Sequence, residues 1–283
     1  MVLESLTNPF KAEQKPWGLF GIGFLYAAIA VFASLWIFRE QASMVMVFFA
    51  VIAGLPLFYH TMQVEEKKDL KLLKEMQMLR EHAKALRFFI LFFCGVTVAF
   101  TAAYVILPAE TTSALFSAQE TTIVTVNQKV TGNMFSLDIL SKIFLNNIKV
   151  MVFSLLFSFL YGTGALFILM WNASVLAAAA GNFFRSHLAE YAASSGFAQV
   201  GAYFAVSSFT VLRYAIHGIP EILGYFVAGL AGGILSVSIM RKDYQNHEFE
   251  RVLLDVSDLV VLAALILFAA AILEVYVTPL FFL

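Results

Sequence analysis

Six polar or ionisable residues lie within or beside long apolar stretches of the sequence, where such side chains are costly and are therefore candidates for function. They are Asn146, Asn147, Lys149, His217, Glu221 and Glu274. Asn146 and Lys149 are three residues apart, so they share one face of a helix, and a buried Lys149 needs a carboxylate to offset its charge. Glu221 and Glu274 are the carboxylates expected at the same depth. The sequence therefore predicts that the six side chains meet in one buried polar cluster.

The role of this cluster is open on the sequence alone. It is either a structural network that fixes the register of the helices or a site for conduction, proton relay or ligand binding, because intramembrane ionisable groups serve both purposes. A metal site made of His217, Glu221, His187 and Glu190 is conceivable from the ligand types, but no tight ligand spacing supports it. No metal and no cofactor are therefore expected.

His217, Gly218, Pro220 and Glu221 together have the composition of a helix start. Glycine permits an unusual backbone angle, proline fits the first helical turn, and glutamate complements the positive end of the helix dipole. The sequence therefore predicts a break at residues 217–221, followed by a new helix.

Motifs of known catalytic chemistry are absent from the sequence, which contains no Walker loop, no HExxH, no GxSxG and no paired aspartates in its apolar stretches. The single cysteine, Cys94, excludes an internal disulfide and a multi-cysteine metal site. A net charge of -1 gives no basic excess for nucleic acid. We therefore expect no catalytic residues, no enzyme activity and no nucleic-acid partner.

The elements that must position the cluster are membrane helices. Of the 283 residues, 61% are hydrophobic and 13% are charged, against about half and about a quarter in soluble domains. Apolar stretches of about 17 to 24 residues are long enough to cross roughly 30 Å of hydrocarbon. The sequence predicts an all-α, polytopic transmembrane helix bundle in the lipid bilayer. The seven expected spans are residues 17–38, 44–59, 88–107, 144–161, 166–184, 221–240 and 258–278.

Three segments outside these spans carry polar residues. Residues 63–87 hold seven basic residues, and their apolar spacing predicts an amphipathic helix that extends both flanking spans, either as a solvated connector or as a docking surface. Residues 108–141 are rich in Thr, Ser, Asn and Gln and are expected to form a loop, in which alternation over 121–130 predicts a small β-hairpin. Residues 196–216 are apolar but interrupted by polar side chains, which favours a re-entrant or interfacial helical segment.

The distribution of basic residues predicts the orientation, because cytoplasmic loops are enriched in Lys and Arg. If residues 196–216 do not cross, twelve of the eighteen Lys and Arg residues lie inside, whereas ten do if the segment crosses. The first arrangement is favoured. It gives a multi-pass cell-membrane protein with a cytoplasmic N-terminus and an extracytoplasmic C-terminus.

Small residues recur along the expected spans or mark tight turns between them, and such residues let helix backbones approach closely. Packing within the chain is the first explanation, and the face of a homo-oligomer is the alternative. The residues concerned are Gly162, Gly164, Gly218, Gly224, Ala228, Gly229 and Gly232.

Several of these residues carry a resemblance to a known family. The Asn146-Asn147 pair, the His217-Gly218-x-x-Glu221 step and the small residues around them resemble the stage II sporulation protein M family of membrane proteins. The resemblance covers residues 88–283, a transmembrane domain of five spans, and leaves residues 1–87 as an N-terminal transmembrane hairpin with its cytoplasmic helix. Where the family tends to have Asn-Gly, this chain has Asn172-Ala173, so no glycine-dependent bend is expected there.

In spore-forming bacteria the resemblance implies a membrane scaffold that holds cell-wall-degrading partners during engulfment. Together with the missing catalytic motifs, it predicts a non-enzymatic scaffold that assembles other membrane or extracytoplasmic proteins at the cell membrane. The alternative is a small transporter or channel that uses the polar site at the His217–Glu221 break.

Overall fold

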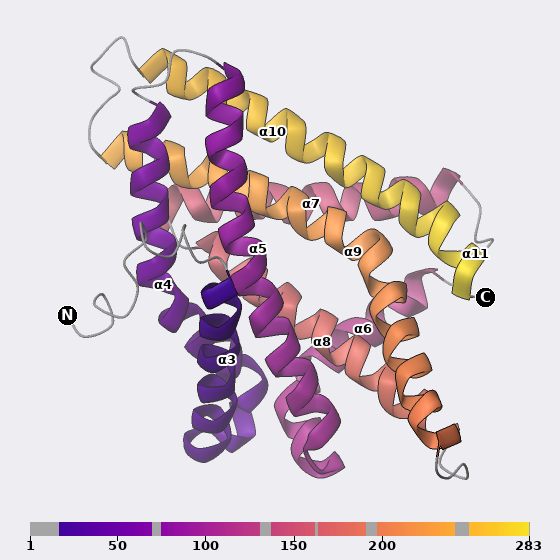
Figure 1. Ribbon diagram of the computed structural model, residues 1–283. Coiled ribbons are helices and arrows are strands. Elements are labelled where there is room, and N and C mark those ends of the chain that lie inside the picture. Colours follow the sequence, from indigo (N-terminus) through magenta and orange to yellow (C-terminus); the bar gives the residue numbers. More distant parts are fainter. Residues whose placement is uncertain are drawn as a thin grey trace.

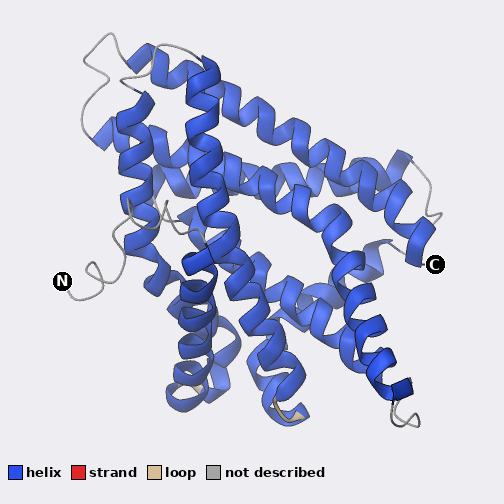
Figure 2. Ribbon diagram, viewed as in Figure 1, coloured by secondary structure: helices blue, strands red, loops and turns tan. Residues whose placement is uncertain are grey.

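The computed structural model describes residues 17–69, 75–130, 137–161, 164–190, 197–240 and 249–282. Within these ranges the elements are helices, and no strand is present (Figure 2). The all-α class predicted from the sequence is confirmed.

Eight long helices make up this part of the chain (Figure 1). They are α3 (Trp17–Ile37), α4 (Ala42–Asp69), α5 (Glu75–Ile106), α6 (Ala109–Val130), α7 (Leu137–Tyr161), α8 (Gly164–Glu190), α9 (Phe197–Met240) and α10 (Phe249–Ile272). A 3₁₀ turn, η1 (Arg39–Gln41), links α3 to α4, and a π-helical turn, η3 (Leu273–Val277), joins α10 to the short α11 (Thr278–Phe282).

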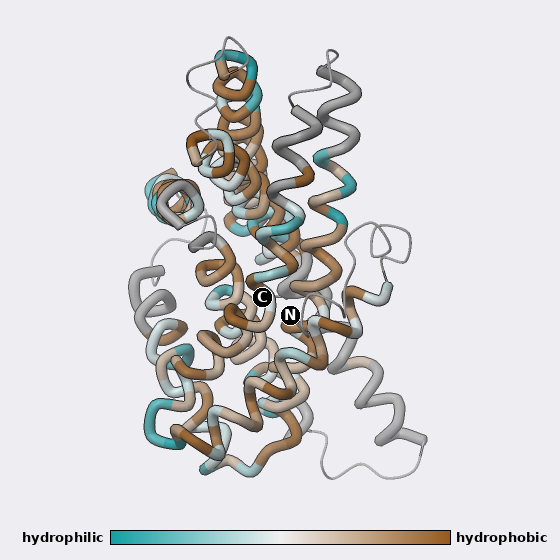
Figure 3. The backbone as a smooth tube through the Cα atoms, turned by 90° about the vertical axis from the view of Figure 1, so that its left-hand side faces the viewer, coloured by the Kyte–Doolittle hydropathy of each residue, from teal (hydrophilic) through white to brown (hydrophobic). Residues whose placement is uncertain are grey.

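Seven helices of the described chain are long and apolar enough to cross a membrane, as the sequence predicts. Hydrophobic residues occupy most of the length of these helices (Figure 3). The stretches are Trp17–Ile37, Arg39–Thr61, His82–Ile106, Leu137–Ser158, Leu166–Ser186, Ile216–Met240 and Phe249–Leu280. Large apolar side chains such as Trp17 and Phe32 are exposed on the outside of the bundle. Lipid rather than water is the solvent that such a surface fits.

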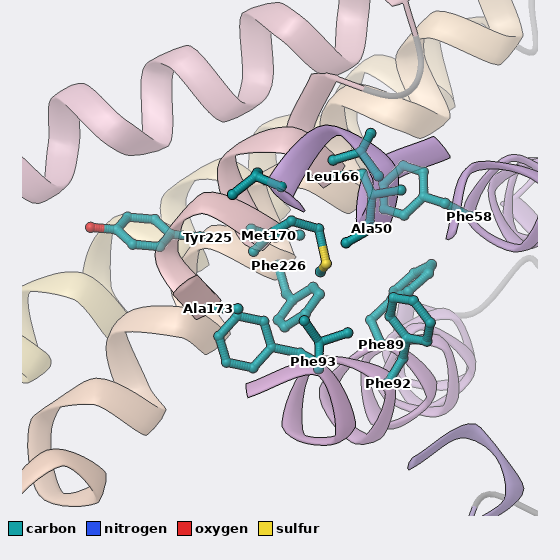
Figure 4. Packing of buried hydrophobic residues seen from close by; sticks show 14 of the residues in the cluster. Ala50, Phe58, Phe89, Phe92, Phe93, Leu166, Met170, Ala173, Tyr225 and Phe226 are labelled. Atoms are coloured by element: carbon teal, nitrogen blue, oxygen red, sulfur yellow. The ribbon is translucent and has the colours of Figure 1, made fainter. Parts of the chain in front are cut away.

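Aromatic residues from several helices form the centre of the core (Figure 4). The rings of Phe89 on α5 and Phe226 on α9 stack with their centroids 5.9 Å apart, and Phe58 of α4 lies 4.9 Å from Phe89. Met170 of α8 is fully buried in the same cluster. Such ring pairs add about 0.5–1.5 kcal/mol beyond the burial of their area. The first two spans therefore share one core with the later ones.

The predicted loop at residues 108–141, with its β-hairpin at 121–130, is wrong, because Ala109–Val130 form α6 and α7 begins at Leu137. The hydroxyl groups of Thr121 and Thr122 donate to the carbonyl oxygens four residues earlier, at 2.9 Å each. This bond lets threonine remain in a helix despite its preference for strands. Leu115 and Phe116 bury one face of α6, and packing of that face outweighs local propensity.

The predicted break at residues 217–221 is also wrong. Pro220 lies inside α9, which runs without interruption from Phe197 to Met240. Proline removes one backbone donor and its ring pushes on the preceding turn, which bends a helix without ending it. Figure 1 shows the resulting change of direction along α9. Its 44 residues correspond to about 66 Å of helix. The bend divides the helix into two arms, and the second arm contains the apolar stretch Ile216–Met240.

The polar segment at 63–87 extends both neighbouring spans, as the sequence predicts. Helix α4 continues to Asp69 and α5 begins at Glu75, while residues 70–74 lie outside the described chain. The segment 196–216, expected to be re-entrant or interfacial, forms the first arm of α9 from Phe197 onward.

Candidate functional site

Tyr225 is the centre of the buried polar cluster. It lies on α9 one turn after Glu221, is 1% exposed, and places its hydroxyl oxygen 2.7 Å from Glu221 Oε1. The same oxygen lies 3.1 Å from Oδ1 of Asn147 on α7, a side chain that is 3% exposed. In Figure 4 the hydroxyl group points away from the aromatic core. One side chain therefore links two helices through buried hydrogen bonds.

Glu274 joins the cluster from the π-helical turn η3. Its carboxyl group interacts electrostatically with Glu221 and with Tyr225. One helical turn before Glu221 on α9, Nδ1 of His217 lies 3.1 Å from Oγ1 of Thr278, the first residue of α11. A π-helical turn adds a residue to the helical repeat and reorients the side chains around it, and such turns are common at functional sites.

The contacts between α9 and α10 fix an antiparallel register. Nδ1 of His217 lies 3.1 Å from Oγ1 of Thr278, and a Cβ on Gly224 would lie 2.7 Å from Cγ of Leu267. Residue numbers rise along α9 while they fall along its partner, and Figure 1 shows the two helices side by side. The start of the second arm of α9, with His217 and Glu221, therefore lies beside the C-terminal end of the chain.

Lys149 does not enter this cluster, contrary to the expected pairing with Glu221 or Glu274. Lys149 and Asn146 are exposed on α7, whereas Asn147 is buried. Residues two apart on a helix point about 200° away from each other, so Asn147 and Lys149 cannot both face α9. No salt bridge of Lys149 is found among the described residues.

The structure therefore brings together Asn147, His217, Glu221 and Glu274 and leaves Asn146 and Lys149 outside. It adds Tyr225 and Thr278, which the sequence reading missed. Tyr225 follows Glu221 by four residues, the spacing of neighbours on a helix face, so its role had a signal in the sequence. Thr278 had none.

The small residues predicted for helix packing fall into different environments. A Cβ on Gly232 would lie 2.7 Å from the carbonyl oxygen of Leu155 on α7, so only glycine fits there. Gly224 is equally close to α10, whereas a Cβ on Gly218 would meet no heavy atom within 4 Å. Ala228 and Gly229 are buried, Gly164 is the first residue of α8, and Gly162 lies outside the described residues.

A second polar contact, also missed from the sequence, fixes α6 to the bundle. Nε2 of Gln119 donates to the backbone oxygen of Ser43 on α4 at 3.1 Å and to Oγ of Ser174 on α8 at 3.0 Å. Gln119 is completely buried. Hydrogen bonds between helices in an apolar surrounding contribute about 0.6–2 kcal/mol each.

Groups that could hold a metal ion through three or more His, Cys, Asp or Glu side chains are not found in the part of the chain that the structure describes. The side chains of His187 and Glu190, considered from the sequence as ligands, lie outside that part.

Comparison with protein-family models gives one match. The model of stage II sporulation protein M matches residues 88–279. Comparisons with curated proteins and with solved structures gave no match. The matched region includes both arms of α9, the π-helical turn and all residues of the polar cluster. The chain is therefore a multi-pass membrane protein that belongs to the stage II sporulation protein M family.

Proposed function

We propose that the protein is a non-enzymatic membrane scaffold that holds partner proteins at the cell membrane. The observation that carries this proposal is the exposed polar face of α6. Ser113 and Ser117, on either side of a kink at Phe116, are exposed, while Leu115, Phe116 and Gln119 are buried. A helix that is anchored on one face and polar on the other presents a fixed surface to a partner.

Contacts at several points hold α6 in place and support this role. Besides the bonds of Gln119, the hydroxyl group of Tyr104 donates to Glu120 at 2.8 Å and Arg39 of η1 pairs with Glu110 at 3.1 Å. The Arg39 pair is exposed and contributes little, so among these polar contacts those of Gln119 and Tyr104 contribute more. A surface held in this way loses little conformational entropy when a partner binds.

Membership of the stage II sporulation protein M family adds support, because the family resemblance implies a scaffold for cell-wall-degrading proteins. The partner expected for α6 is accordingly another membrane or extracytoplasmic protein.

Site-specific photo-crosslinking in cells tests this proposal. A photoreactive amino acid is placed at Ser113 or Ser117, and for comparison at Val98, which is 46% exposed on the apolar face of α5. The scaffold proposal predicts adducts with the same second protein from both serine positions and none from Val98. Identical adduct patterns at all three positions, or adducts at α6 only with copies of the chain itself, would contradict it.

A small transporter or channel is the second candidate, favoured by one observation. Glu221 and Glu274 both lie within apolar stretches that could span a membrane, and acidic residues in that position often mark ion or proton paths. The continuous α9 removes the broken helix on which this alternative first rested, so the carboxylate pair is its remaining support.

A further inference from the structure

We propose that the outward face of α7 around Lys149 docks, within the membrane, a transmembrane helix of a different protein that carries an acidic residue. This face, the Lys149 surface, consists of Leu145, Asn146, Lys149, Val152 and Phe153. The inference does not rest on the scaffold role of α6, because it concerns another helix and other residues.

Helix α7 is a peripheral helix of the described bundle. Its apolar stretch Leu137–Ser158 is 22% buried, against 78% for Ile216–Met240 of α9. Every residue of the Lys149 surface is exposed, whereas Asn147 and Ser154 are buried on the other side of the helix. The Lys149 surface is therefore open to a partner.

Contacts between α7 and α9 fix the depth of Lys149. A Cβ on Gly232 would lie 2.7 Å from the backbone oxygen of Leu155, and the hydroxyl group of Tyr225 lies 3.1 Å from Oδ1 of Asn147. Residue numbers rise together along both helices, so the helices are parallel. The two contacts place Lys149 level with the first or second residue after Tyr225.

This level is close to the middle of the bilayer. It lies ten or eleven residues after the start of Ile216–Met240 and thirteen or fourteen residues before the end of that stretch. These separations correspond to about 15 Å and about 20 Å along the helix. A lysine stem of four methylene groups is too short to carry the ammonium group from there to the lipid headgroups. The Lys149 surface therefore fits a membrane-embedded partner better than a headgroup.

The charge of Lys149 is not offset within the described chain. Positions three and four residues away on α7 hold no acidic side chain, and no salt bridge of Lys149 is found in the described ranges. Lys142 on the same helix differs, because its Nζ lies 2.6 Å from Oδ2 of Asp138. An unpaired charge at the centre of a bilayer is strongly unfavourable. A carboxylate supplied from outside the chain would offset it.

A second copy of the chain presents no suitable carboxylate at that depth. Copies with the same orientation in a membrane are related by an axis along the membrane normal, so each residue keeps its depth. Asp258 of α10 is exposed, but the contact of Gly224 with Leu267 places it level with residue 233 of α9. This is about 9–10 Å along the helix from the level of Lys149. A different protein is free of this constraint.

The remaining side chains of the Lys149 surface fit an apolar helix with one acidic residue. Leu145, Lys149 and Val152 are four and three residues apart, so they form one stripe along α7. Phe153 stacks on Phe157 with the ring centroids 6.1 Å apart, which adds an apolar side to this stripe. Asn146 is exposed three residues before Lys149, and amide side chains hydrogen-bond across helices in membranes.

Association with a designed transmembrane peptide in liposomes tests the proposal. The peptide is an apolar helix of leucine and alanine with one central glutamate, and the matched peptide carries glutamine there. Energy transfer between labelled peptide and labelled full-length protein measures binding. We expect the glutamate peptide to bind wild type and Lys142→Met equally, and to bind Lys149→Met at least about tenfold more weakly. The glutamine peptide should bind wild type at least about tenfold more weakly than the glutamate peptide does.

A charge reversal completes the test. Lys149→Glu should bind a peptide with central lysine and lose the glutamate peptide. Binding of the glutamate peptide to neither protein, or equally to wild type and Lys149→Met, would overturn the proposal, as would failure of the reversed pair. Energy transfer between two labelled copies of the chain that is lost in Lys149→Met would also overturn it, because the occupant would then be a second copy. None of these measurements involves α6, so their outcome is separate from that of the crosslinking experiment.

Discussion

Nε2 of His82 lies 3.0 Å from Oδ2 of Asp255, a hydrogen-bonded contact that joins the start of the α5 span to α10. The two residues are 173 positions apart in the sequence, and the side chain of His82 is almost fully buried. Their contact holds α5 against α10, while the Glu221–Tyr225–Asn147 contacts join α9 to α7. The tertiary arrangement of these helices thus depends on a few polar contacts placed in an apolar core.

Replacing Asp255 with alanine should destabilise the bundle by about 1–3 kcal/mol, because it leaves the buried His82 ring without this partner. Unfolding by denaturant in detergent micelles measures the change. Lys142→Ala, which breaks the exposed pair with Asp138, is the control and should change the stability by less than about 0.5 kcal/mol. Equal effects of both substitutions would show that the His82–Asp255 pair has no special weight.

Replacing Tyr225 with phenylalanine should cost about 1–2 kcal/mol, since the ring still fills its place while Glu221 and Asn147 lose their shared partner. Thermal unfolding of the purified protein measures the effect. Tyr59→Phe, at a partly exposed position on α4, should be close to neutral. A Tyr225→Phe protein as stable as wild type would argue against a structural role for the network.

Gly232→Ala should destabilise the protein by about 1–3 kcal/mol, because its Cβ would press on the Leu155 carbonyl group and the Ser158 side chain. Gly218→Ala is the matched control. Its Cβ meets open space, and alanine is the better helix former, so stability should stay equal or rise by up to about 1 kcal/mol. Comparable losses in the two variants would mean that helix approach at Gly232 is not the limiting contact.

Gln119→Ala should loosen α6 selectively. The substitution removes the bonds to Ser43 and Ser174 and leaves a gap in the buried face. Hydrogen exchange followed by mass spectrometry should show faster exchange in α6 with little change in α9. Ser113→Ala, on the exposed face, should leave both rates unchanged. Faster exchange throughout the protein after Gln119→Ala would assign Gln119 to general stability and not to α6.

The sequence predicted the elements more fully than their contacts. Seven spans follow from apolar length, which the bilayer thickness dictates. The α6 helix was missed because threonine favours strands locally, and only the packing of Leu115 and Phe116 decides for a helix. The uninterrupted α9 was missed for a similar reason: Gly218 and Pro220 are typical of a helix start, and tertiary contacts keep the bend helical.

The sequence predicts which polar residues lie at the depth of the cluster. It does not predict which of them face the interior of the bundle. Asn146, Asn147 and Lys149 lie at nearly the same depth in α7, and only the rotation of that helix decides that Asn147 turns inward. Rotation depends on packing against neighbours such as Gly232, and this information is distributed over several helices. The pairing of Glu221 with Tyr225 is local, which makes it the part of the cluster most accessible from sequence.

We infer that the polar cluster of α7, α9 and η3 holds these helices in register and does not conduct ions through the bilayer. Flux of ions and protons into liposomes that contain the purified protein tests this most directly, with wild type compared to Glu221→Gln. We expect no flux above that of empty liposomes for folded wild type. Flux through wild type that is lost in Glu221→Gln would contradict it and identify the cluster as part of a transport path.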